Sequence, residues 1–255
     1  MNLFEKFKQL HHNPEPFVLG NIWDVSSAKV FEASGYKAIG VSSHAISNAW
    51  GYNDGENLPF EVLLQVAKRV VEAVNVPFTV DMEGGYSSSL TGILDNINKL
   101  HDAGVVGINL EDTVPGDKRR FQPVDGFQRT LSAIAEYISR NNLQLFLNVR
   151  TDGFLLGLPN ALDETLIRIK AYENTGADGI FVPCITAASD IRTVVSESKL
   201  PINVMCMPQL PGFDELQTLG VKRISMGPFL FSKVYGDATA MAKAVIADKS
   251  FAAIL

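Results

Sequence analysis

The chain has 255 residues, of which 46% are hydrophobic and 20% are charged, and its formal net charge at pH 7 is −6. This length fits one large α/β barrel or two ordinary domains, and the composition is that of a globular protein able to bury a core. The negative charge, with no basic run longer than Lys118-Arg119-Arg120, argues against a nucleic-acid partner. No uninterrupted apolar stretch approaches the length of a membrane span, so we expect no membrane partner either.

The N-terminal segment and the two cysteines bear on the location of the protein. Residues 1–7 begin an amphipathic helix and lack the apolar core of a signal peptide. Cys184 and Cys206 each end an apolar run, which favours reduced thiols over a disulfide framework. We therefore expect a cytoplasmic protein.

Short apolar runs alternate with amphipathic segments along the chain. The candidate strands are Phe17–Ile22, Ala38–Ser43, Phe78–Glu83, Gly107–Asp112, Leu145–Arg150, Gly179–Cys184, Ile202–Met207 and Arg223–Gly227. Helical patterns lie between them at 26–34, 60–74, 87–103, 126–141, 163–175, 187–197 and 213–219, and a C-terminal helix starts near residue 229. Such alternation implies parallel strands joined by right-handed crossovers, and eight units in this length predict a (β/α)₈ TIM barrel.

The punctuation between these segments favours one barrel domain over residues 1–255. Gly35, Gly104, Gly176 and Gly220 each follow a helical stretch and precede a strand, which is the helix C-cap use of glycine. No linker or low-complexity stretch divides the chain. An open doubly wound sheet is the alternative fold, and the lack of a Gly-x-Gly-x-x-Gly loop after the strands disfavours it.

The third candidate strand ends in two acids, within the stretch Phe78–Tyr86. Strand side chains alternate between faces, so Asp81 and Glu83 are expected on the same face. The same parity places Glu111 on the polar face of the fourth strand and Arg150 on that of the fifth. Because barrel enzymes keep their active sites at the C-terminal ends of the strands, we expect these four side chains to meet there.

Three inward carboxylates would raise one another's pKa values unless a cation relieves the repulsion. Mg²⁺ prefers a few carboxylates and keeps several waters, so Asp81, Glu83 and Glu111 are candidate ligands for Mg²⁺, with Mn²⁺ as the alternative ion. The four histidines do not pair at ligand spacing, which disfavours zinc. Arg150 offers a fork to a substrate carboxylate, and metal plus arginine suits a 2-oxo acid. Helix caps and salt bridges are the ordinary alternatives, and Arg150 would then only neutralise the acids.

Two loops add further candidates. Ser42 and Ser43 end the second strand, where small residues let backbone N–H groups approach an anion. His44 and Asp54 lie in the long loop expected after them. The charged loop 113–123 after the fourth strand, which contains Lys118, suits a lid. A solvated loop is the plain alternative for each.

Six motifs in chain order resemble those of the isocitrate lyase/phosphoenolpyruvate mutase superfamily. They are Trp23–Ala28 with Gly35-Tyr36, Ser42-Ser43 with Gly51–Asp54, Asp81–Tyr86, Asn109–Asp112, Asn148–Asp152, and Ala177–Pro183. The resemblance implies a Mg²⁺-dependent (β/α)₈ barrel that acts on 2-oxo or 2-hydroxy acids through an enolpyruvate-like species. It also implies a homodimer or homotetramer that exchanges the last helix, here the segment after Gly227.

The resemblance assigns roles to several of the candidate residues. Asp81, Glu83 and Glu111 correspond to the metal carboxylates, directly or through water. Ser42, Ser43 and Arg150 correspond to the groups that hold the pyruvyl carboxylate, and we add His44 and Asp81 to the substrate-binding set. Asp54 matches a loop acid near the substrate.

The chain departs from the family at the loop that follows Glu111. The isocitrate and methylisocitrate lyases carry a Lys-Lys/Arg-Cys-Gly-His loop, whereas residues 116–121 contain neither Cys nor His. The mutase carries Glu-Asp-Lys and a Lys-Thr-Asn-Ser lid, whereas Thr113 follows Glu111-Asp112 here and that lid is absent. Those three activities are therefore disfavoured, and the chain resembles a branch without these signatures.

We therefore expect a Mg²⁺-dependent lyase or hydrolase that breaks a C–C or P–C bond beside a pyruvyl unit. Asp54 or Lys118 would move the proton, with Arg150 as the third catalytic residue. Phosphoenolpyruvate mutase or phosphonopyruvate hydrolase chemistry is the first alternative. A non-catalytic dicarboxylate-binding barrel is the second. A nucleotide-binding regulator is a weaker alternative, for which Gly227-Pro228 is the one weak anion-site candidate.

Overall fold

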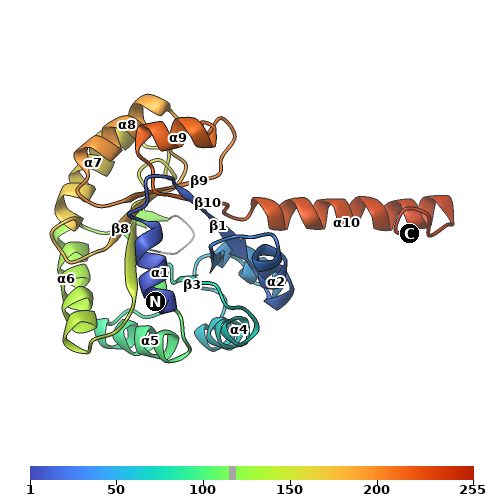
Figure 1. Cartoon of the computed structure of the whole chain (residues 1–255), viewed down its shortest axis with the longest axis horizontal. Coiled ribbons are helices and arrows are strands. Elements are labelled where there is room, and N and C mark those ends of the chain that lie inside the picture. The colour runs from blue at the N-terminus through green and yellow to red at the C-terminus, as the bar shows by residue number, and fades with distance from the viewer. Residues whose placement is uncertain (115–118) are drawn as a thin grey trace.

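The computed structural model describes residues 1–114 and 119–255. Eight parallel strands close into a barrel in the order β1-β10-β9-β8-β7-β4-β3-β2. Their bounds are β1 Phe17–Ile22, β2 Ala38–Val41, β3 Phe78–Asp81, β4 Gly107–Glu111, β7 Phe146–Arg150, β8 Gly179–Val182, β9 Ile202–Met205 and β10 Arg223–Ser225. Figure 1 shows the helices arranged around these strands.

The helices alternate with the strands as a barrel requires. Their bounds are α1 Leu3–Leu10, α2 Val25–Ala33, α3 Ser43–Ala49, α4 Phe60–Ala73, α5 Leu90–Asp102, α6 Val124–Arg140, α7 Ala161–Tyr172, α8 Ala188–Glu197, α9 Phe213–Leu219 and α10 Phe229–Asp248. The predicted TIM barrel and its eight strands are therefore confirmed. Most strands end one or two residues before the predicted ends, because the chain has already turned into the loop that carries the polar residues.

Two segments expected to be loops contain regular structure. The stretch after β2 begins as α3, and the hydroxyl oxygen of Ser42 caps this helix by accepting a hydrogen bond from the backbone N–H of Ala45 at 3.3 Å. In the predicted lid, β5 (Thr113–Val114) pairs antiparallel with β6 (Arg120–Phe121). Both elements lie beside the C-terminal ends of the barrel strands.

The apolar core fills the layer between strands and helices, while the barrel interior is partly polar. Asn109 on β4 lies in register with Asn148 on β7, and the Asn148 amide donates to Asn109 Oδ1 at 2.8 Å. The Ser225 hydroxyl likewise donates to Asn203 Oδ1 at 3.1 Å. The parity predicted for the fourth and fifth strands is thus confirmed, with the polar sets facing inward.

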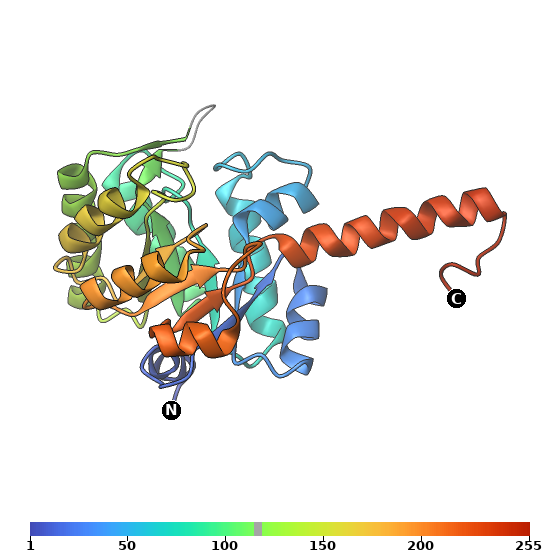
Figure 2. The same ribbon diagram turned by 90° about the horizontal axis from the view of Figure 1, so that it is seen from above.

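Helix α1 closes the end of the barrel at which the strands begin, away from the α3–α4 segment (Figure 2). Phe7 is fully buried, and its ring meets those of Phe17 and Phe146 edge-on, with centroids 6.0 and 5.4 Å away. His11 stacks on Phe146 at 4.0 Å and donates from Nδ1 to the Phe7 carbonyl at 2.9 Å. This aromatic plug seals the barrel from below.

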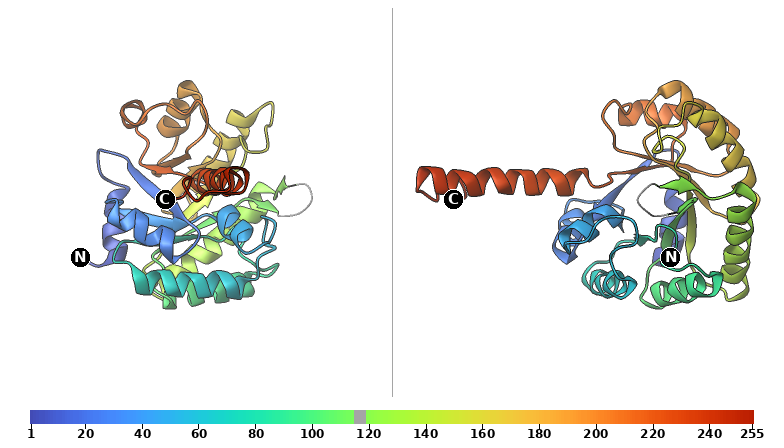
Figure 3. Two further views of the ribbon diagram at one scale, coloured as in Figure 1. Left: turned by 90° about the vertical axis from the view of Figure 1, so that its right-hand side faces the viewer. Right: turned by 180° about the vertical axis from the view of Figure 1, so that it is seen from behind.

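Helix α10 projects away from the barrel (Figures 1 and 3). All twenty of its residues are described, and none is buried. Its exposed apolar side chains include Val234, Met241 and Ile246. Both cysteines, Cys184 and Cys206, are free. Among the described residues, no helix has the length and apolarity needed to cross a membrane.

The His11 plug makes stability fall in acid. Burial, followed by the charge of Arg223, lowers the pKa of His11 from 6.5 to about 3. Below pH 6.5 the unfolded chain therefore takes up a proton that the folded chain does not, and the free energy of unfolding falls by up to about 1.4 kcal/mol per pH unit. We expect the H11F variant, which keeps a ring on Phe146 but cannot titrate, to lack this loss. Urea unfolding at pH 7.5 and pH 5 gives the free energy of unfolding of both proteins. The difference between the wild type and H11F should be smaller at pH 5 than at pH 7.5, by up to about 2 kcal/mol. An unchanged difference would contradict the assignment.

Candidate active site

A cavity of about 390 Å³ opens at the C-terminal ends of the barrel strands. It is lined by six of the residues predicted for the site, together with Asn21, Asn109, Arg119, Leu155, Leu156, Phe181, Met205, Ser225, Gly227 and Pro228. The six predicted residues are Ser42, Ser43, His44, Asp54, Asp81 and Arg150. The structure therefore brings together residues from β2, β3, β7 and the α3–α4 loop. Lys118 lies outside the described residues.

Arg150, at the end of β7, is surrounded by acids. Its Nε and Nη2 donate to the two carboxylate oxygens of Asp152 at 2.6 and 3.2 Å. Its Nη1 lies 3.1 Å from Glu111 Oε2 and 3.8 Å from Asp81 Oδ2. Since every nitrogen of the fork faces a carboxylate, Arg150 neutralises the acids in this structure, which is the plainer of its two expected roles.

The two carboxylate oxygens of Asp81 differ, because one is hydrogen-bonded and the other is not. The Ser43 hydroxyl donates to Asp81 Oδ2 at 3.0 Å, whereas Oδ1 is buried and has no hydrogen-bond partner among the described residues. Asp54 Oδ1 and Glu111 Oε2 are also buried without a hydrogen-bond partner among the described residues, although Glu111 Oε2 forms an ion pair with Arg150. Because a buried carboxylate oxygen without a donor is costly, the free oxygens of Asp54 and Asp81 fit a bound cation.

Glu83 departs from the predicted parity. The strand β3 ends at Asp81, and Glu83 adopts a left-handed backbone conformation with φ +48°, so strand alternation no longer directs its side chain. Its carboxylate accepts from the backbone N–H of Glu56 at 3.1 Å and from the Tyr86 hydroxyl at 3.1 Å. The predicted strand therefore ends before Glu83, and the prediction that Glu83 points the same way as Asp81 no longer follows from strand alternation.

The acids nevertheless influence one another electrostatically. Burial raises the pKa of Glu83 to about 8, with further contributions from Asp54, Asp81 and Glu111. Burial likewise raises the pKa of Glu111 to about 7 and raises that of Asp81. Within the described residues, no three His, Cys, Asp or Glu side chains are already arranged as a metal site. The predicted ligands are thus crowded neighbours whose role in metal binding stays a prediction.

Two residues near the cavity were missed by sequence reasoning. Arg119 forms ion pairs with Glu111 and with Asp152 Oδ2, the latter at 3.1 Å. Asp152 is fully buried and forms ion pairs with both Arg119 and Arg150. Arg119 was visible only as part of a basic run, and Asp152 only as the last residue of a motif, because neither position lies on a regular strand face.

The mouth of the cavity carries a histidine–carboxylate pair. His44 Nδ1 lies 3.7 Å from Asp54 Oδ2, and the His44 side chain is 47% exposed. Both residues come from the segment between β2 and α4. The pair is close enough to the solvent to exchange protons with it.

The weak anion site at Gly227-Pro228 is not supported. The backbone N–H groups of Met226 and Gly227 donate to the side-chain oxygen of Asn21 at 2.8 and 3.1 Å. These donors are therefore already satisfied by β1.

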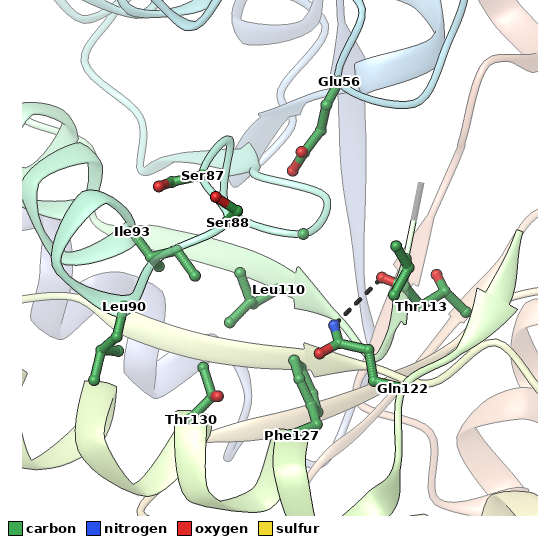
Figure 4. Close-up of a pocket in the computed structure, with 12 residues that line it drawn as sticks. Glu56, Ser87, Ser88, Leu90, Ile93, Leu110, Thr113, Gln122, Phe127 and Thr130 are labelled. Atoms are coloured by element: carbon green, nitrogen blue, oxygen red, sulfur yellow. Dashed lines mark hydrogen bonds between the residues drawn. The ribbon is translucent and has the colours of Figure 1, made fainter. Parts of the chain in front are cut away.

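A second cavity, of about 310 Å³, lies beside the first, between the β3–α5 loop and α6 (Figure 4). Glu56 points toward it from above, and Leu90, Ile93 and Phe127 line its lower part (Figure 4). The Glu56 carboxylate accepts from the backbone N–H of Tyr86 at 2.8 Å. Glu56 thus ties the α3–α4 loop to the loop after β3.

A buried ion pair supports the site from behind. Arg168 on α7 is 3% exposed and donates to Asp112 Oδ2 at 3.2 Å, to which the Tyr172 hydroxyl also donates at 3.1 Å. Its guanidinium lies 3.4 Å from the ring centroid of Phe121 and donates to the Gln122 carbonyl at 3.3 Å. This network fixes the base of the β5–β6 hairpin on the barrel.

Parallel βα units with acids and arginines gathered at the C-terminal ends of the strands define an α/β-barrel enzyme. The chain belongs to the phosphoenolpyruvate phosphomutase family, whose model matches residues 7–246, and so to the isocitrate lyase/phosphoenolpyruvate mutase superfamily. The resemblance seen in the sequence is thereby confirmed.

Individual relatives differ in what is known of them. An uncharacterized protein of Mycobacterium tuberculosis is 31% identical over 239 residues, which cover 94% of this chain and 88% of the relative. An oxaloacetate decarboxylase of Paraburkholderia xenovorans is 26% identical over 235 residues, 89% of this chain and 77% of that enzyme. A crystal structure from Burkholderia cenocepacia J2315, described as a candidate phosphonomutase, has a TM-score of 0.89 and 34% identity and covers 94% of this chain and 99% of its own.

The Arg168–Asp112 pair yields a stability prediction. Burial raises the pKa of Asp112 to about 6, so this acid is ionised at pH 7.5 and needs its cation. We expect R168M to lower the free energy of unfolding by about 3–5 kcal/mol, because it leaves a buried charge unpaired. The double variant D112N/R168M should recover part of this loss, and R69M, at a side chain 71% exposed, should have little effect. Urea unfolding at pH 7.5 measures all three, and equal losses in R168M and R69M would refute the network.

Proposed function

We propose that the protein is a divalent-metal-dependent lyase or hydrolase that cleaves a C–C or P–C bond beside the pyruvyl unit of a 2-oxo or 2-hydroxy acid. The observation that carries this proposal is that Asp54 and Asp81, which line one cavity, each have a buried carboxylate oxygen without a hydrogen-bond donor among the described residues. Glu111, paired with Arg150, lies next to them. Membership of a superfamily that includes an oxaloacetate decarboxylase and a 2-methylisocitrate lyase supports it.

Asp81, Glu83 and Glu111 would hold the ion, which we propose to be Mg²⁺, with Mn²⁺ as the alternative. Carboxylates are the ligands that this ion prefers. Burial raises the pKa values of all three acids, and a bound cation would stabilise their ionised forms. When bound, the ion would polarise the 2-oxo group and stabilise the negative charge that develops on an enolpyruvate-like species.

The protein groups around the ion would position the substrate. Ser43 keeps Asp81 in place through its hydroxyl. The Ser42 oxygen accepts the helix cap bond, so its own O–H remains able to donate to the pyruvyl carboxylate. Arg150 would pair with that carboxylate in exchange for one of its present acids.

When the bond breaks, its electron pair stays on the pyruvyl unit as the enolpyruvate-like species, and to give pyruvate the carbon that carried the leaving group must then take up a proton. Asp54 and His44, 3.7 Å apart at the mouth, are placed to carry it between solvent and cavity. Lys118 remains the alternative donor from the sequence.

Substitution of Asp81 tests whether the protein binds a divalent metal ion at this site. We expect D81N to abolish Mg²⁺ binding in calorimetric titration and to lower pyruvate release by more than about 100-fold, because the variant removes the charge of a carboxylate that faces the ion. The matched control is D95N, an exposed acid on α5. Unchanged metal affinity in D81N would show that the metal assignment is wrong.

A substrate panel separates the reaction classes. Pyruvate release from 2-oxo and 2-hydroxy diacids, with and without Mg²⁺, tests the C–C branch. Phosphorus NMR on phosphonopyruvate tests the P–C branch, and no turnover there removes it. Binding of 2-oxo acids without turnover of any panel member would favour the non-catalytic barrel.

We also propose that the protein is a homodimer or homotetramer in which α10 packs on a neighbouring subunit. Its exposed apolar side chains support this, since an isolated projecting helix gains little stability on its own.

Charges on α10 test the assembly. We expect M241E/I246E to shift the mass measured by light scattering toward the monomer, because both side chains are exposed and apolar. K243E, on the same helix at an exposed charged position, should keep the wild-type mass. A monomeric wild type would contradict the proposal.

A further inference from the structure

The cavity at the strand ends has two unlike halves. Among the described residues, the ionisable side chains that line it come from α3, the α3–α4 loop, β3, the segment before β6, and β7. The opposite half, built by β8, β9 and the β7–α7 loop, presents Phe181, Met205, Leu155 and Leu156. The substrate therefore meets charge on one side and an apolar wall on the other.

The apolar wall is held in place by its own packing. Phe181 is 5% exposed, and its ring centroid lies 5.9 Å from Arg150 Cζ, so the wall begins directly beside the polar half. Gly227 adopts φ +60°, and a Cβ there would meet Met205 Sδ at 2.8 Å, which shows that the Met205 side chain packs on this glycine. The wall is therefore part of the barrel.

The polar side chains of Asn21 and Ser225, which line the cavity on this side, carry no charge. Asn21 Oδ1 accepts two backbone N–H groups, and the Ser225 hydroxyl donates to Asn203. A phosphonyl or carboxyl group placed against Phe181, Met205 and Leu156 would lose hydration, and these side chains offer it no hydrogen-bond donor. A small alkyl group would gain free energy from the same burial.

Resting on the proposed function, we infer that the substrate is a 2-oxo or 2-hydroxy acid that carries a small alkyl substituent beside its pyruvyl unit. The pyruvyl end would lie toward Asp81 and Arg150, and the alkyl substituent would contact Phe181, Met205 and Leu156. These three residues would then select the substrate, while the polar half performs the chemistry.

The affinity of simple 2-oxo acids tests this inference. In calorimetry with Mg²⁺, the series pyruvate, 2-oxobutyrate, 2-oxovalerate should bind about fourfold more tightly with each added methylene, as expected for burial of a CH₂ group. L156A and M205A should each reduce this increment to about twofold or less, because they remove the contacting wall. L90A, which alters the second cavity (Figure 4), should keep the increment.

The outcomes distinguish this inference from the proposed function. If pyruvate binds with Mg²⁺ but the longer acids bind no more tightly, the alkyl site is refuted and the proposed function stands. If pyruvate itself does not bind with or without Mg²⁺, the proposed function fails and the inference fails with it. An increment lost in L90A but retained in L156A and M205A would place the alkyl group in the other cavity and also refute the inference.

Discussion

Uncompensated negative charge at the C-terminal end of the barrel is the constraint on which the site depends. Five carboxylates gather there: Asp54, Asp81, Glu83, Glu111 and Asp152. Two arginines, Arg119 and Arg150, offset part of this charge through direct ion pairs. Like charges in a poorly hydrated space repel strongly, and proteins respond by raising pKa values or by binding cations. Burial is the largest cause of the raised pKa values of Glu83 and Glu111, and the charges of neighbouring carboxylates raise them further.

The fold holds this unfavourable charge by fixing the segments that carry it. The loop after β3 is tied to the α3–α4 loop by reciprocal bonds, since the N–H of Glu56 donates to Glu83 and the N–H of Tyr86 donates to Glu56. The β5–β6 hairpin, from which Arg119 reaches the acids, is anchored through the backbone bond from Gln122 to Asp112 and through Arg168. The bonds between the two loops hold Glu56, Glu83 and Tyr86 in left-handed backbone conformations, with φ +60°, +48° and +56°, which residues other than glycine rarely adopt.

The framework could be predicted from the sequence because it depends on local patterns. Alternation of apolar runs with amphipathic segments is set by backbone geometry, and it located every barrel strand to within about two residues at either end. Strand parity correctly faced Asn109 and Asn148 inward, and it does not apply to Glu83, because the backbone has left the strand there. The role of Arg119 was not predictable, because it depends on a hairpin whose position is set by the distant Arg168.

The division of the cavity also explains why related chains can perform different reactions. Relatives that share the barrel include an oxaloacetate decarboxylase, a phosphoenolpyruvate phosphomutase and a 2-methylisocitrate lyase, so the shared fold does not determine the bond that is broken. A polar half that grips a pyruvyl unit would serve all three chemistries equally well. Selection must then come from the part of the substrate that differs, and we infer that in this chain this part would lie against Phe181 and Met205, which line the cavity. Because a neutral wall cannot compensate a second anionic group, it penalises a phosphonyl substituent and admits an alkyl one. On this argument, substrate choice is made by β8 and β9, across the barrel from the acids that first identify the site.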